Sequence, residues 1–155
     1  MKQSVFSDVK ITDFLDPRFQ NAFKSYFAEL GIVVRDWDGL FREMSQGEGT
    51  TAIVRSDPTG AVIGFIIYET IELKSWFFEK TAGFIREFWV ANGFRGLGHG
   101  SDLLRLVEED FGGQGIRSIM LTTDTAEGFY QTRGFRLDPS MKAKNGDPVY
   151  VKELS

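Results

Sequence analysis

A chain of 155 residues suits one domain with a buried core, so we expect a single domain over residues 1–155. Its formal net charge of −4 argues against general nucleic-acid binding, which needs a basic surface. The absence of cysteine excludes disulfides and thiolate catalysis, and a single histidine excludes any site that needs two imidazoles. No metal centre is expected.

The first residues lack the apolar core of a signal peptide, and no apolar run is long enough to cross a membrane. We therefore expect a cytoplasmic protein that does not associate with a membrane. The acidic balance mildly favours a cationic partner such as an amine.

The first third of the chain predicts a strand followed by two helices. A short strand is expected at residues 5–11. Asp16 and Pro17 then form a typical helix start, and aromatic residues recur at helical spacing until Gly31. A second helix is expected around residues 37–47.

The rest of the chain alternates strands with two more helices. The sequence Asp57-Pro58-Thr59-Gly60 predicts a turn. Asp124 and Glu127 are expected to cap a short fourth helix that ends at Gly134. The expected strands are residues 50–55, 61–73, 81–90, 116–122, 135–137 and 149–152, and a third helix is expected over residues 101–111. This alternation by itself indicates an α/β or α+β domain.

The sequence Arg95-Gly96-Leu97-Gly98-His99-Gly100 follows a predicted strand and precedes a predicted helix. A glycine-rich turn in this position leaves backbone N–H groups without partners at the positive end of a helix dipole. Such a turn binds anions, usually phosphates. The sequence of this turn excludes a Walker loop, because no lysine follows the last glycine. The third glycine is also one residue too early for a dinucleotide fingerprint.

Arg95-x-x-Gly98-x-Gly100 resembles the Q/R-x-x-G-x-G/A signature of the GNAT N-acetyltransferase superfamily. Val90 stands five residues earlier, as in the V-x-P-x-x-R-G run of that family, although Asn92 replaces the usual proline. Residues 126–135, AEGFYQTRGF, resemble its A-x-x-x-Y-x-x-x-G-F segment, and residues 60–65 its turn into the third strand. The resemblance covers residues 50–136 in the expected order.

This resemblance implies a GNAT fold: a mixed, mostly antiparallel sheet of about seven strands, flanked by four helices, with a splay between the fourth and fifth strands. It implies transfer of an acetyl group from acetyl-CoA to a primary amine of a small molecule or peptide. Dimers are common in the family, so a homodimer is an open expectation.

The resemblance also assigns the cosubstrate site. Backbone amides of the loop formed by Arg95, Gly96, Leu97, Gly98, His99 and Gly100 would hold the pyrophosphate, and Arg95 would add positive charge against it. The His99 ring is expected to face solvent. The backbone of Phe88 and Val90, on the free edge of the fourth strand, would pair with the pantetheine arm and polarise the acyl carbonyl.

Two residues are candidates for proton transfer. The resemblance places Tyr130 where the family has a general acid for the leaving thiolate, and a tyrosine with an ordinary pKa of about 10 holds its proton at neutral pH. The alternative is a core aromatic. Glu87 is the candidate base for the amine, directly or through water. Its alternative is a structural carboxylate paired with a neighbour such as Arg86, and Glu69 and Glu72 are weaker candidates.

Aromatic residues of the first two helices and of the turn before the fourth strand are candidates for an acceptor pocket, although core packing explains each one as well: Trp37, Phe41 and Trp76. Two alternatives to an enzyme stay open. One is a catalytically silent acyl-CoA-binding or interaction module of the same fold. The other is a different nucleotide-binding protein that has the same pattern of glycines.

Overall fold

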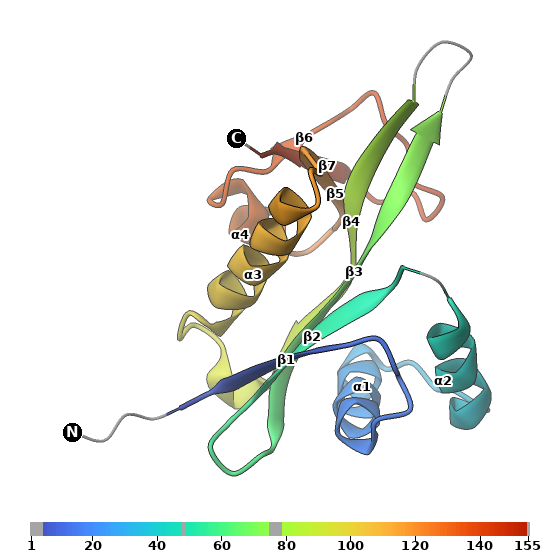
Figure 1. Cartoon of the computed structure of the whole chain (residues 1–155), viewed down its shortest axis with the longest axis vertical. Coiled ribbons are helices and arrows are strands. Elements are labelled where there is room, and N and C mark those ends of the chain that lie inside the picture. Colours follow the sequence, from blue (N-terminus) through green and yellow to red (C-terminus); the bar gives the residue numbers. More distant parts are fainter. Residues whose placement is uncertain (1–4, 48, 75–78, 155) are drawn as a thin grey trace. The chain divides into compact units, whose positions relative to one another are not determined.

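The computed structural model of the chain describes residues 5–47, 49–74 and 79–154. Figure 1 shows its elements in chain order. They are β1 (Ser7–Ile11), α1 (Pro17–Leu30), α2 (Trp37–Gln46), β2 (Thr51–Ser56), β3 (Val62–Lys74), β4 (Glu79–Val90), the 3₁₀ turn η1 (Asn92–Phe94), α3 (His99–Gly113), β5 (Ser118–Thr122), α4 (Glu127–Gln131), β6 (Arg136–Leu137) and β7 (Val149–Glu153).

The strands form one seven-stranded mixed sheet in the order β1-β2-β3-β4-β5-β7-β6. The pairs β1–β2, β2–β3, β5–β7 and β6–β7 are antiparallel, whereas β4 and β5 are parallel. Parallel pairing of β4 with β5 comprises Gly83 with Ile119 and Phe84 with Met120. Such short pairing is what two splayed strands leave. The expected mixed sheet of about seven strands is confirmed.

The chain divides into two compact units, one of residues 1–68 and 87–106 and the other of residues 69–86 and 107–155. The core of the first unit is largely aromatic. The ring of Phe19 in α1 lies 6.2 Å from that of Phe41 in α2 and 5.4 Å from that of Phe65 in β3. Helices α1 and α2 therefore bury their apolar faces in one core with β3.

The sequence signals at the two ends of α1 are confirmed. The Asp16 carboxylate accepts a hydrogen bond from the backbone N–H of Arg18 at 2.8 Å, and Pro17 begins the helix. At the other end Gly31 adopts a left-handed φ of 72°, and Ile32 donates its N–H to the Phe27 carbonyl. This arrangement satisfies carbonyls that the helix leaves unpaired.

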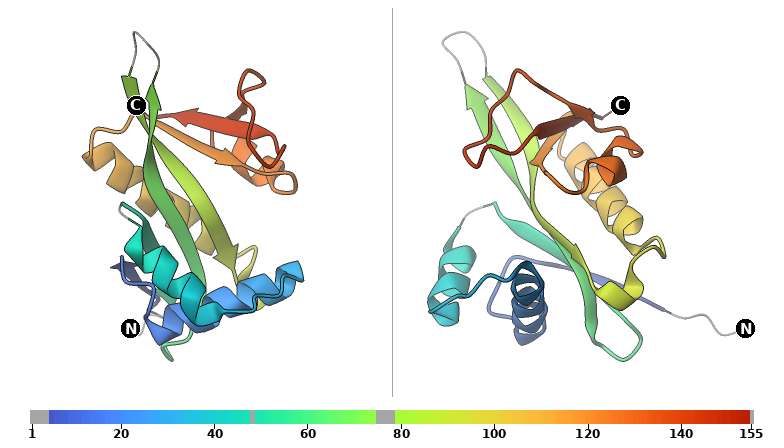
Figure 2. Two further views of the ribbon diagram at one scale, coloured as in Figure 1. Left: turned by 90° about the vertical axis from the view of Figure 1, so that its right-hand side faces the viewer. Right: turned by 180° about the vertical axis from the view of Figure 1, so that it is seen from behind.

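In the second unit, β5 and β7 lie side by side (Figure 2). Ala82, Met120 and Val149 form a small core with apolar neighbours. Gly83 lies under the ring of Phe111, since a Cβ built there would come within 2.6 Å of the ring. A glycine is therefore required where α3 packs on β4.

The start of α4 differs from expectation. Asp124 and Glu127 do not form the expected capping pair, and the residue before the helix, Ala126, makes no side-chain cap hydrogen bond. The hydroxyl of Thr123 instead accepts the N–H of Ala126 at 3.0 Å. The helix also ends earlier than expected, and a turn with Gly134 at a φ of 94° carries the chain into β6.

Candidate functional site

The glycine loop lies between η1 and α3, as expected. Gly96 and Gly98 have φ values of 77° and 92°, which are strained for any residue with a Cβ. Helix α3 begins at His99, two residues earlier than expected, and its first internal hydrogen bond runs from Asp102 N–H to the Gly98 carbonyl at 3.1 Å. The amides of His99 and Gly100 precede that bond, at the positive end of the helix dipole.

The Arg95 side chain fixes the start of this loop. Its Nε donates to the Val90 carbonyl at 2.7 Å and its Nη2 to Glu29 in α1 at 2.5 Å. This hydrogen bond from Arg95 lowers the pKa of the Glu29 carboxyl. The guanidinium thus joins the loop to α1 and to the end of β4, while Gly96, Leu97 and Gly98 are exposed.

The His99 ring does not face solvent, and this expectation is wrong. Only 8% of His99 is exposed, and its Nδ1 lies 3.1 Å from a guanidinium nitrogen of Arg55 in β2. The expectation failed because Arg55, whose guanidinium contacts the ring, lies 44 positions away in the sequence.

The end of β4 shows the predicted alternation of faces. Trp89 is buried beside Phe65, with 5.6 Å between their rings, and Glu87 reaches Tyr26 of α1. Phe88 and Val90, both half-buried, occupy the alternate positions. A Cβ on Gly64 of β3 would lie 2.9 Å from the Trp89 carbonyl. The backbone of β3 therefore approaches β4 closely at the strand segment expected to bind pantetheine.

Glu87 accepts a short hydrogen bond from the phenol of Tyr26. Arg86, the neighbour named for a structural pairing with Glu87, forms an ion pair with Glu69 at 3.4 Å. Glu72 accepts the hydroxyl of Thr81 at 2.8 Å. Glu87 differs from Glu69 and Glu72 in that its partner, Tyr26, lies in helix α1.

Trp89 lies two positions after Glu87, on the same face of β4. It is 7% exposed. After the hydrogen bond from Arg95, a hydrogen bond from the Trp89 side chain also helps to lower the pKa of the Glu29 carboxyl.

Tyr130 lies in α4 and is buried among aromatic residues of its own unit. Its ring lies 5.2 Å from that of Phe129 and 5.5 Å from that of Phe135. Burial raises the pKa of the phenol to about 12. The group is therefore a neutral hydrogen-bond donor throughout the physiological pH range, whether its role is chemical or structural.

Two of the aromatic candidates for an acceptor pocket, Trp37 and Phe41, belong to the core of the first unit. Phe41 is fully buried, and its ring stacks on that of Trp37 with centroids 5.6 Å apart. Trp76 lies outside the described residues.

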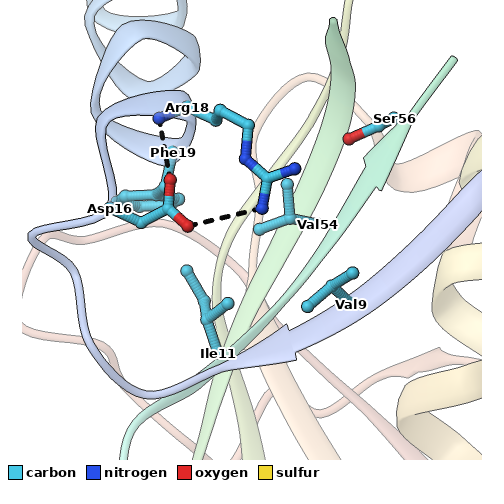
Figure 3. A pocket seen from close by; sticks show the side chains of 7 residues that line it. All are labelled: Val9, Ile11, Asp16, Arg18, Phe19, Val54 and Ser56. Carbon is cyan, nitrogen blue, oxygen red and sulfur yellow. Dashed lines mark hydrogen bonds and ion pairs between the residues drawn. The ribbon is translucent and has the colours of Figure 1, made fainter. Parts of the chain in front are cut away.

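A small hollow lies beside β1, β2 and the start of α1, where Asp16 and Arg18 face each other (Figure 3). Its volume of about 10 Å³ is close to that of one water molecule. Its lining, Val9, Ile11, Asp16, Arg18, Phe19, Val54 and Ser56, includes none of the predicted site residues. The hollow is therefore not a cosubstrate pocket.

Comparison with known protein families identifies the family of this chain. The sequence model of the acetyltransferase (GNAT) family matches residues 9–135, and the chain belongs to this family. No curated protein matches the sequence. No helix in the described residues is both long and apolar enough to span a membrane.

Three solved structures illustrate the shared fold. An acetyltransferase of the GNAT family from Staphylococcus aureus Mu50 is 18% identical, with a TM-score of 0.72 over 97% of this chain and 100% of the other. Arabidopsis thaliana NAA60, in complex with a bisubstrate analogue, is 14% identical, with a TM-score of 0.70 and the same coverage. The aminoglycoside acetyltransferase meta-AAC0020, from an uncultured soil metagenomic sample, is 14% identical, with a TM-score of 0.66 over 90% and 91%.

Proposed function

We propose that this protein is an N-acetyltransferase that transfers the acetyl group of acetyl-CoA to a primary amine. Membership in the GNAT family carries the proposal. The left-handed glycines Gly96 and Gly98 at the start of α3 support it, because they open the backbone of a helix N-terminus to an anion.

The reaction proposed is a direct attack in a ternary complex. The amine nitrogen forms a bond to the thioester carbonyl carbon, the carbon–sulfur bond breaks, and CoA leaves as a thiolate that takes up a proton. The chain has no cysteine to carry an acyl group, which supports direct transfer. Backbone amides of residues 95–100 would hold the pyrophosphate, and the backbone of Phe88 and Val90 would position the thioester.

Glu87 is proposed to take the proton of the amine, directly or through water. An amine with a pKa of about 10 is mostly protonated at neutral pH and cannot attack until it loses that proton. The hydrogen bond from Tyr26 favours the ionised form of Glu87, which is the form able to accept the proton.

Tyr130 is proposed to donate to the departing sulfur. Burial raises its pKa to about 12, whereas an ordinary thiol has a pKa of about 8.5. Complete proton transfer from the phenol to a thiolate is therefore uphill in the free protein. We expect a hydrogen bond from Tyr130 to stabilise the developing negative charge before the proton moves.

The activity is tested by incubating the protein with acetyl-CoA and a panel of small-molecule and peptide amines. Release of free thiol together with a product heavier by one acetyl group supports the proposal. Acetyl-CoA binding without acetylation of any amine in the panel favours the alternative, a silent acyl-CoA-binding module.

A further inference from the structure

A buried arginine lies behind the glycine loop. Arg55 in β2 is 7% exposed and stands directly opposite Asp8 of β1 in the strand register. Its Nε and one terminal nitrogen donate to the two Asp8 carboxylate oxygens at 2.7 and 2.8 Å. This two-pronged ion pair fixes the plane of the guanidinium and raises the pKa of Arg55.

The remaining terminal nitrogen of Arg55 points to the start of α3. It donates to Asp102 Oδ2 at 3.0 Å and lies 3.1 Å from His99 Nδ1. A guanidinium can only donate, so the Nδ1 atom must offer its lone pair. The hydrogen bond therefore assigns the proton of the neutral imidazole to Nε2.

The His99 ring in turn joins the two ends of the glycine loop. Its centroid lies 5.9 Å from the ring of Phe94, the residue before Arg95, and 4.5 Å from that of Phe6. Both contacts are edge-on, the arrangement that aromatic rings prefer. The segment of four residues between Phe94 and His99 is thus fixed at both ends, while its tip stays exposed.

The pairing of β2 with β3 is irregular at Arg55. The β2–β3 register shifts between Arg55, opposite Gly64, and Ser56, opposite Val62. Such irregularities commonly re-aim a side chain. A buried ion pair contributes little net stability compared with apolar residues of similar size, because desolvation offsets the attraction. The arrangement is better explained by the position it imposes than by stability.

We propose that Arg55 is a positioning residue that, through His99 and Asp102, holds the amides of residues 96–100 in the conformation that binds the pyrophosphate of acetyl-CoA. The inference rests on the proposed function. Its physical basis is preorganisation: a loop that is already ordered loses less entropy when the ligand binds.

The test compares acetyl-CoA dissociation constants by calorimetric titration for the wild type, His99→Leu, His99→Asn and Arg55→Met. Arg18→Met is the matched control, because Arg18 is exposed and its ion pair is with Asp16, the N-cap residue of its own helix. Leucine removes the acceptor for Arg55, whereas the asparagine side-chain oxygen can stand near the position of Nδ1. We expect about tenfold weaker binding for His99→Leu and Arg55→Met, the loss of one charge-assisted hydrogen bond.

His99→Asn should recover most of that loss, and Arg18→Met should bind like the wild type. Thermal unfolding of each variant shows whether it is folded at the titration temperature. If Arg55→Met is unfolded, the comparison of His99→Leu with His99→Asn tests the inference, because both variants keep the Arg55–Asp8 ion pair. Equal dissociation constants for His99→Leu and the wild type would overturn the inference. Absence of binding by the wild type would instead overturn the proposed function.

Discussion

At the scale of single residues, the proposed base Glu87 accepts a hydrogen bond from Tyr26. The Tyr26→Phe variant loses this donor and keeps the aromatic ring beside Phe65. Since a hydrogen bond to a carboxylate favours its charged form, the acidic limb of the pH profile of kcat/KM should move to higher pH in this variant.

Glu87→Gln is the companion variant and should lower kcat/KM about 100-fold at neutral pH. If the pH profiles of Tyr26→Phe and the wild type superimpose while Glu87→Gln is inactive, Glu87 acts without help from Tyr26. If Glu87→Gln is fully active, another group or water removes the proton.

Tyr130→Phe tests the proposed donor to the leaving group. The phenylalanine keeps the ring contacts with Phe129 and Phe135, so the fold should persist. Turnover should fall about 100-fold, as for loss of a general acid, while acetyl-CoA affinity stays nearly the same. Tyr150→Phe, at another buried tyrosine, is the control. An unchanged turnover number would remove Tyr130 from the mechanism.

At the scale of elements, the conformation of the glycine loop is testable at Gly98. A Cβ there meets open space, so steric contact does not oppose alanine, but the φ of 92° does. Holding a non-glycine residue in such a region costs about 1–3 kcal/mol. Gly98→Ala should therefore weaken acetyl-CoA binding about tenfold or more.

Gly93→Ala is the matched control for this substitution, because Gly93 also meets open space and does not have a positive φ. It lies in η1, just before the loop. Calorimetric titration of both variants measures the difference, and equal affinities would show that the left-handed backbone at Gly98 is not needed for the ligand.

At the scale of the whole molecule, Tyr130 links stability to alkaline pH. Its pKa is raised from 10.0 in the unfolded chain to about 12 by burial, so the folded protein keeps a proton that the unfolded chain releases. The contribution of Tyr130 to the free energy of unfolding should therefore be constant below pH 10 and fall between pH 10 and 12, by up to about 3 kcal/mol.

The decline should be smaller in Tyr130→Phe, which has no phenol to ionise. Urea unfolding of both proteins at pH 8 and at pH 11 measures the difference. A decline of equal size in the two proteins would mean that Tyr130 is accessible to solvent in the folded state.

Local signals made much of this fold predictable. Asp16, Pro17 and Gly31 determine the ends of α1 through hydrogen bonds and backbone angles within a few residues of each other. The sequence of residues 95–100 likewise predicted the position of the loop at the start of α3, because glycine conformations and helix dipoles act locally.

Long-range partners were not predictable. The contacts between Tyr26 and Glu87 and between Arg55 and His99 join residues 61 and 44 positions apart, and nothing near either residue specifies them. One signal was present: Arg55 is a charged residue within the otherwise uncharged strand TAIVRS. A charge in a buried strand indicates a partner, although not which one.

The most direct test of the account is calorimetric titration of the purified protein with acetyl-CoA, beside Arg95→Ala. We predict micromolar binding, equivalent to about −8 kcal/mol. Binding should weaken in Arg95→Ala, which loses the positive charge at the loop and its hydrogen bonds to Val90 and Glu29. No binding at millimolar acetyl-CoA would contradict the acetyltransferase proposal and leave the glycine loop as a site for a different anion.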